Sequence, residues 1–151
     1  MSISSLQITS ASADPALLTL PWSIPLEDWP HEVLAALPRG ISRHTVRFVK
    51  LSGQVLAVKE IGEVVAFSEY ELLRQLSKTD IPSVEPVGVI TGRKDANGER
   101  LEAVLITKHL QFSLPYRSLF SQALQPDTAP RLIDTIAMIT ERLHLIAFNW
   151  A

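Results

Sequence analysis

One lysine in a mostly apolar segment is a residue of this chain that could do chemistry. The segment VLAVKEI (residues 55–61) has the character of a β-strand, and alternation places Lys59 on the same face as Ala57 and Ile61. An unpaired ammonium group on a core-like face would cost several kcal/mol to bury. The segment therefore predicts either an acidic partner for Lys59 or an edge strand from which its side chain reaches water.

The next segment along the chain offers such an acid. Residues 64–77 have helical periodicity, and Val65 and Leu72 lie on an apolar stripe that also contains Glu69. A contact between Lys59 and Glu69 would neutralise both charges. The alternative is a rotated helix that leaves Glu69 partly exposed. A functional pair and a purely structural pair both remain open, because both kinds occur in proteins.

The elements that must position this pair are mostly strands. The predicted strands cover residues 43–50, 54–61, 84–92 and 101–110. A turn at Ser52-Gly53 joins the first two strands, and a turn containing Asn97-Gly98 joins the last two. The helix with Glu69 falls between the two hairpins. This order predicts an α+β fold with an antiparallel sheet.

The remaining segments define the expected domain boundaries. Residues 1–19 are predicted to be a flexible N-terminal tail, and residues 20–110 to form the sheet domain with an N-terminal arm. Within the arm we expect a short helix near Pro30–Leu37, with Trp22 and Trp29 pinning the arm to the body.

Residues 111–151 are expected to be an exit segment followed by helices. A short helix is predicted at 113–124, and a longer one is capped by Asp127 or Thr128. The longer helix carries an apolar stripe formed by Leu132, Ile136, Ile139, Leu143 and Ile146. Its other apolar residues would be left exposed, which predicts self-association or a partner through this helix. They are Ile133, Met138, Leu145, Phe148 and Trp150.

Composition excludes several classes of protein. The chain has 151 residues, of which 46% are hydrophobic and 20% charged, as is typical of a globular protein. It contains no cysteine, no paired histidines and no apolar run long enough to span a membrane. The first basic residue is Arg39, so no signal peptide is predicted and a cytoplasmic location is expected. A net charge of −2 without basic clusters argues against nucleic-acid binding.

Two motifs resemble the protein-kinase-like fold. LAVKEI is similar to the kinase strand motif Val-Ala-Ile-Lys, and EYELL on the next helix resembles the kinase helix C pattern. The order of hairpin, lysine, helix with glutamate and two further strands also resembles a kinase small lobe. GISRHTVRFV, TKHLQFSLPYRSLF and LHLIAFNW further resemble an uncharacterised group of bacterial proteins related to the lipopolysaccharide (Kdo and heptose) kinases. The resemblance covers residues 20–151.

The resemblance implies an ATP site whose phosphate end contains the charged pair. Lys59 would hold the α- and β-phosphates of ATP, and Glu69 would fix Lys59. The glycine-rich loop of protein kinases is missing, and GISRH stands in its place. Arg43 or His44 could contact phosphate there, although surface polarity in a turn explains both residues as well.

The same resemblance assigns the adenine end. Ala57 would roof the adenine ring, and Thr107 in VLITKHL would be the gatekeeper, unless it is an ordinary strand threonine. The backbones of Lys108 and Leu110 would face the edge of the adenine.

The resemblance also has a limit at its C-terminal end. In the resembled family a sequence like LHLIAFNW leads into Gly-Asp and a later Asn, which supply the catalytic base and a magnesium ligand, whereas this chain stops at Ala151. We therefore expect the nucleotide-binding portion of an ATP-dependent phosphotransferase that is catalytically incomplete, with Mg²⁺ bound only when a large lobe is present. The alternative is a non-catalytic kinase-like or other α+β binding or interaction module.

Overall fold

The structure is a computed structural model that describes residues 5–11, 14–37, 42–110 and 125–148. The chain divides into two units, each of which is described by itself. The first unit contains residues 1–75 and 84–109, and the second contains residues 76–83 and 110–151.

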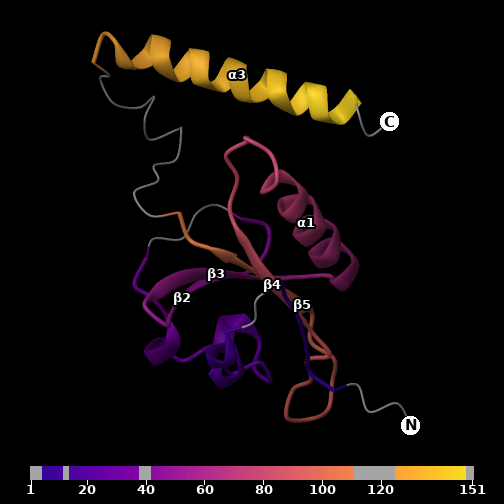
Figure 1. Ribbon diagram of the computed structural model, residues 1–151. Coiled ribbons are helices and arrows are strands. Elements are labelled where there is room, and N and C mark those ends of the chain that lie inside the picture. The colour runs from indigo at the N-terminus through magenta and orange to yellow at the C-terminus, as the bar shows by residue number, and fades with distance from the viewer. Residues whose placement is uncertain (1–4, 12–13, 38–41, 111–124, 149–151) are drawn as a thin grey trace. The chain divides into compact units, whose positions relative to one another are not determined.

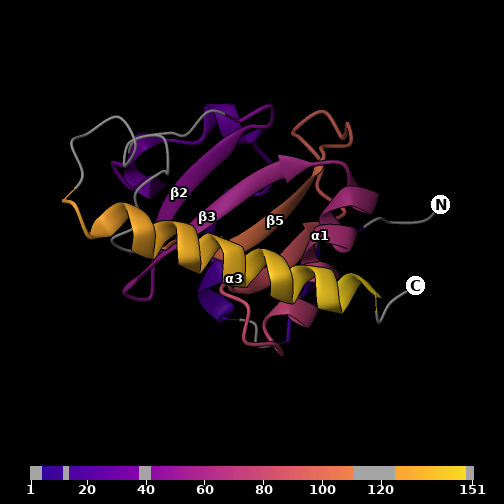
Figure 2. The same ribbon diagram turned by 90° about the horizontal axis from the view of Figure 1, so that it is seen from above.

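An antiparallel sheet of five strands forms the centre of the first unit (Figure 1). The strands are β1 (Gln7–Thr9), β2 (Val46–Leu51), β3 (Gln54–Ile61), β4 (Pro86–Thr91) and β5 (Ala103–Lys108). Their spatial order is β1-β4-β5-β3-β2, which places β3 between β5 and β2, as Figure 2 shows from above. Helix α1 (Glu63–Leu76) follows β3, and the second unit contains helix α3 (Thr128–Phe148). The expected α+β class with an antiparallel sheet is confirmed.

Both predicted hairpins are present, and residues with positive φ angles form their turns. Between β2 and β3, Ser52 and Gly53 have positive φ angles of 50° and 78°. Between β4 and β5, Gly98 has a φ of 80°, and the carboxylate of Asp95 accepts hydrogen bonds from the backbone N–H groups of Asn97 and Glu99. Both turns use backbone conformations that favour glycine, so short-range sequence sufficed to predict them.

The sheet is covered on both faces. On one face the buried residues come from the N-terminal arm and the sheet: Leu17, Leu20, Trp22, Leu26, Trp29, Val49, Leu56, Val58, Ile90, Val104 and Ile106. On the other face the buried residues come from α1 and the sheet: Ile61, Ala66, Tyr70, Val89, Ala103 and Leu105. Figure 1 shows α1 and the arm on opposite sides of the strands. Alternate residues of β3 therefore contribute to two different cores.

The prediction of a flexible tail at residues 1–19 is wrong for the residues of this range that the structure describes. Gln7–Thr9 forms β1, which pairs with β4 at the edge of the sheet, and Leu17 is fully buried in a short 3-10 helix at Pro15–Thr19. Small polar residues suggested a tail, but Ile8 and Leu17 supply apolar surface that the sheet can bury. Trp22 and Trp29 do pin the arm as predicted, since both are buried and their rings meet edge to face.

The prediction of a short helix near Pro30–Leu37 is also wrong. Only His31–Val33 forms a helical turn, of the 3-10 type. Leu34 then makes a β-bridge with Val49, and the N–H of Ala35 donates to the carbonyl oxygen of Phe48. The exposed edge of β2 thus competes with helix formation for the backbone groups of this segment.

Helix α1 buries a different face from the one expected. Ala66 and Tyr70 are buried against the sheet, whereas Val65 and Leu72 are each 49% exposed. Small Ala66 allows close approach to the strands, and the ring of Tyr70 fills the space beside it. Glu69 therefore lies beside the core and not within it, so its charge is not buried as the stripe suggested.

One glycine permits β1 to dock. A Cβ atom on Gly88 of β4 would lie 2.7 Å from the carbonyl oxygen of Thr9, which is too close for any side chain. We predict that Gly88→Ala displaces β1 and lowers the free energy of unfolding by about 1–3 kcal/mol. Chemical denaturation and hydrogen exchange at Ile8 would measure both effects.

Gly62, just before α1, provides the matched control for that substitution. A Cβ atom there would meet nothing within 4 Å. Gly62→Ala should change stability by no more than about 0.5 kcal/mol. Equal effects of the two substitutions, or wild-type protection of Ile8 in Gly88→Ala, would contradict the steric explanation.

Helix α3 is described only within its own unit. Its predicted start near Thr128 is confirmed, and five of its large apolar residues are exposed: Ile133, Ile136, Met138, Leu143 and Leu145. The side chain of Phe148, Trp150 and the helix expected at 113–124 lie outside the described residues. Self-association through this helix stays a prediction. No helix among the described residues has the length and apolar character needed to cross a membrane.

Candidate functional site

Lys59 and Glu69 form an ion pair between the sheet and α1. The Nζ atom of Lys59 lies 2.9 Å and 3.0 Å from the two carboxylate oxygens of Glu69, so the contact is bidentate. The side chains are 28% and 38% exposed, respectively. A pair with this much solvent contributes only about 0.2–1 kcal/mol to stability. The prediction that the two charges meet was right, although the premise of a buried pair was wrong.

The pair opens onto a pocket of about 520 Å³ in the first unit. The pocket is lined by Val46, Ala57, Lys59, Glu69, Leu72, Leu73, Val84, Leu105 and Thr107. Four of the six predicted site residues therefore lie together: Ala57, Lys59, Glu69 and Thr107. Apart from the ion pair and the hydroxyl of Thr107, the lining side chains are aliphatic. Such a pocket combines an apolar cavity with one localised polar end, as small-molecule sites commonly do.

Strand register explains why these residues share a face. Ala57 of β3 is paired directly with Thr107 of β5, and Lys59 is paired with Leu105. On the other side of β3, Val46 of β2 is paired with Lys59. Cross-strand neighbours point to the same face of a sheet, so β2, β3 and β5 together form the floor of the pocket.

Sequence reasoning missed five lining residues: Val46, Leu72, Leu73, Val84 and Leu105. Alternation could have found Leu105, because it stands two residues before Thr107 on the same strand face. Leu72 was assigned to the core of α1, whereas it is half exposed at the pocket. Val46 needed the register of β2 on β3, which depends on the length of the hairpin turn.

Lys108 lies differently from the pocket residues. Its N–H donates to the carbonyl oxygen of Glu85 at 2.9 Å, and its ammonium group pairs with the Glu85 carboxylate at 2.7 Å. That amide hydrogen is therefore already used within the protein. Its side chain lines a different pocket, on the face of the sheet that carries the arm. Leu110 is exposed and belongs to the second unit. The expected backbone contacts of Lys108 and Leu110 with adenine stay predictions.

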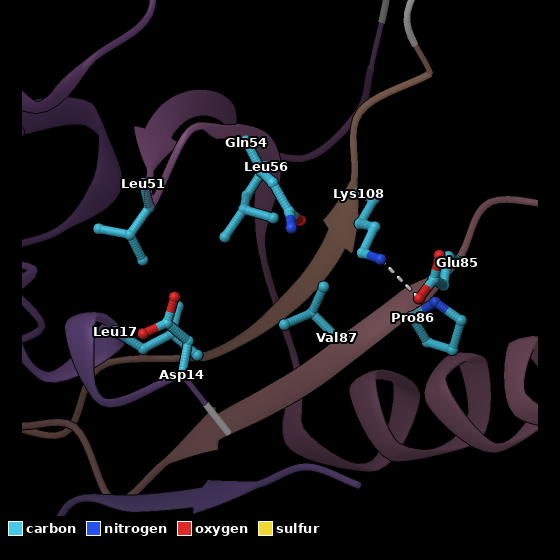
Figure 3. Close-up of a pocket in the computed structure, with 9 residues that line it drawn as sticks. All are labelled: Asp14, Leu17, Leu51, Gln54, Leu56, Glu85, Pro86, Val87 and Lys108. Atoms are coloured by element: carbon cyan, nitrogen blue, oxygen red, sulfur yellow. Dashed lines mark ion pairs between the residues drawn. The ribbon is translucent and has the colours of Figure 1, made fainter. Parts of the chain in front are cut away.

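The pocket beside Lys108 has a volume of about 280 Å³ and is shown in Figure 3. Asp14 lies at its rim, and Leu17 and Leu56 supply part of its apolar wall. Hydrogen bonds from the hydroxyl of Ser52 and the backbone N–H of Ala16 lower the pKa of the Asp14 carboxyl below its ordinary value. This carboxylate is held within the turn that starts the arm, which gives it a structural explanation.

Few of the residues that the structure describes lie at the phosphate end of the expected site. Arg43 and His44 are exposed on a bend before β2 and do not line the pocket with Lys59. Among the described residues, no cluster of three His, Asp or Glu side chains has an arrangement that could hold a metal ion. Contacts of Arg43 or His44 with phosphate stay predictions.

Comparisons of the chain with protein families, with curated proteins and with solved structures find no match. The geometry of the pocket is therefore the observation on which a function must rest.

Proposed function

We propose that this chain is the nucleotide-binding N-terminal portion of a kinase-like, ATP-dependent phosphotransferase. The observation that carries the proposal is the bidentate pair of Lys59 and Glu69 at the end of an aliphatic pocket. A lysine held in this way presents a fixed cation to a phosphate group. The aliphatic floor around Ala57 offers a surface on which a planar base can lie.

The order of elements supports the same proposal. Lys59 is on β3, Glu69 is on the helix that directly follows, and β4 and β5 form the next hairpin. This order resembles that of a kinase small lobe, and Thr107 stands on β5 next to Ala57, where the resemblance expects a gatekeeper. The 2.9 Å contact of Lys59 with Glu69 beside the pocket supports the proposal, whereas an unrelated α+β domain would use the same contact only as a structural ion pair.

The proposal covers nucleotide binding and not the transfer step. Phosphoryl transfer requires magnesium ligands and a group that orients the nucleophile. The proposal assigns neither role to a described residue of this chain. A non-catalytic kinase-like module that binds nucleotide through the same pocket remains the second candidate, because the same ion pair would serve it.

Titration of Mg-ATP by calorimetry would test the role of Lys59. We expect Lys59→Met to weaken binding at least about tenfold, because a charge-assisted hydrogen bond to phosphate is lost. The melting temperature should change little, because the ion pair is partly exposed and contributes little to stability.

Lys94→Met provides a matched control on the β4–β5 hairpin, since Lys94 does not line the pocket with Lys59. It should bind Mg-ATP as the wild type does. Equal affinity of Lys59→Met and the wild type would overturn the proposed role of Lys59. Absence of any ATP binding by the wild-type chain would overturn the proposed function.

A further inference from the structure

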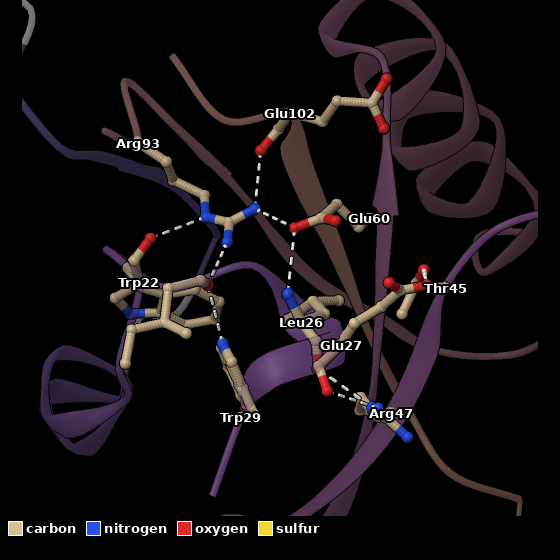
Figure 4. A network of polar contacts seen from close by, with 10 residues as sticks. Trp22, Leu26, Glu27, Trp29, Thr45, Arg47, Glu60, Arg93 and Glu102 are labelled. Atoms are coloured by element: carbon tan, nitrogen blue, oxygen red, sulfur yellow. Dashed lines mark hydrogen bonds and ion pairs between the residues drawn. The ribbon is translucent and has the colours of Figure 1, made fainter. Parts of the chain in front are cut away.

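Arg93, which is fully buried, holds the N-terminal arm against the face of the sheet opposite the pocket with Lys59 (Figure 4). The positive φ of 70° at Gly92 ends β4 and turns the chain at Arg93, whose side chain is 0% exposed. Its Nε donates to the carbonyl oxygen of Trp22 at 2.9 Å, and its Nη2 donates to that of Ile24 at 2.8 Å. Both acceptors belong to the arm, so one guanidinium holds two points of that segment.

The same guanidinium also holds strand β3. Nη1 of Arg93 lies 2.7 Å from Oε2 of Glu60 and 2.7 Å from the carbonyl oxygen of Glu102. Oε2 of Glu60 also accepts a hydrogen bond from the N–H of Leu26 in the arm, at 3.3 Å. Arg93 and Glu60 therefore form a clamp, which we name the Arg93–Glu60 clamp, between the arm, β3 and the start of β5.

The clamp acts at the residue next to Lys59. Neighbouring residues of a strand point to opposite faces, so Glu60 faces the arm while Lys59 faces the pocket. Helix α1 begins at Glu63, three residues after Glu60, and carries Glu69. The end of β3 thus sets both the position of Lys59 and the start of the helix that holds its partner.

We propose that Arg93 and Glu60 are positioning residues for the pair of Lys59 and Glu69, acting from the opposite face of the sheet. This inference rests on the proposed function of that pair as the anchor of the ligand site. A loosened clamp lets the end of β3 shift, and hydrogen bonds between nitrogen and oxygen weaken beyond about 3.2 Å. The ion pair would then open more often, and Lys59 would no longer be held for a phosphate.

The test measures the amine of Lys59 directly. Pulse acylation followed by mass spectrometry gives the labelling rate of Lys59 relative to that of exposed Lys50 in the same molecule. We expect Glu60→Gln and Arg93→Lys to raise the relative rate for Lys59 about fivefold, and to weaken binding of Mg-ATP to a similar extent. All proteins are compared at a temperature where circular dichroism shows them folded.

Val49→Ala is the control for general loss of stability. Val49 is fully buried in the same core, and it takes no part in the hydrogen bonds that form the clamp. It should lower the melting temperature while leaving the relative labelling of Lys59 unchanged. A rise in labelling that is equal in Val49→Ala and Glu60→Gln would assign the clamp a merely structural role and overturn the inference.

The two proposals fail in distinguishable ways. Wild-type labelling of Lys59 in both clamp variants overturns the positioning role, whether or not ATP binds. If the wild type binds no ATP but the clamp variants expose Lys59, the positioning role stands and the nucleotide function falls. Arg93→Lys keeps the positive charge beside Glu60, so it provides the test even if Glu60→Gln does not fold.

Discussion

Arg93→Met should lower the free energy of unfolding by about 3–5 kcal/mol, because it breaks a buried ion pair by removing one partner. Glu60, whose side chain is only 16% exposed, would lose its guanidinium partner. The carbonyl oxygens of Trp22, Ile24 and Glu102 would lose a donor in the same step. Methionine fills much of the same volume, so the loss reports the polar contacts more than a cavity. Urea denaturation followed by tryptophan fluorescence would measure it.

Arg100→Met is the matched control for Arg93→Met. Arg100 lies on the same hairpin between β4 and β5 but is exposed. Its replacement should change stability by no more than about 0.5 kcal/mol. Similar losses in the two variants would show that the Arg93 contacts do not stabilise the fold.

Deletion of residues 1–29 should abolish cooperative folding of the first unit. Five side chains of this segment are buried against the sheet: Leu17, Leu20, Trp22, Leu26 and Trp29. At about 1.5–3 kcal/mol for each buried side chain, they contribute about 8 to 15 kcal/mol in total. Natural domains have a net stability of about 5–15 kcal/mol, so the remaining chain should not stay folded. Circular dichroism and binding of a hydrophobic dye would detect the exposed face.

Leu18→Ala tests the same segment without uncovering the sheet. Leu18 is 63% exposed, although it is adjacent to fully buried Leu17. It should melt as the wild type does. A deletion variant that melts cooperatively at the wild-type temperature would contradict a stabilising role of residues 1–29.

Strands β2 to β5 and their two hairpins could be predicted because their signals are local, whereas β1 was missed. Alternation placed Lys59 and Ala57 on one face of β3, and glycine at positions 53 and 98 predicted both turns. The α+β class followed from the order of these elements. Site residues on the strands could be predicted for the same reason, since Thr107 shares a face with Ala57 through a regular antiparallel register.

The pinning of the arm by Trp22 and Trp29 could be predicted, but the backbone contacts of the arm could not, because they depend on distant partners. The carbonyl groups of Trp22 and Ile24 are satisfied by Arg93, which lies about 70 residues further along the chain. Arg93 itself stands in a polar turn segment and gives no sign in the sequence that it is buried. Only the fold creates an acceptor cage that stabilises a guanidinium away from water.

By itself the sequence determined that Lys59 needs either an acidic partner or access to water, and that Glu69 on the next helix is a candidate partner. Periodicity left the rotation of α1 open, because the face through Val65 and the face through Ala66, about 100° apart around the helix axis, both carry apolar residues. Tertiary packing decided it by burying Ala66 and Tyr70 against the sheet, which turned Leu72 and Glu69 toward the pocket. The charged pair is therefore partly exposed beside a cavity, because the sheet buries the apolar face of α1 that packs best and leaves the charged edge to solvent.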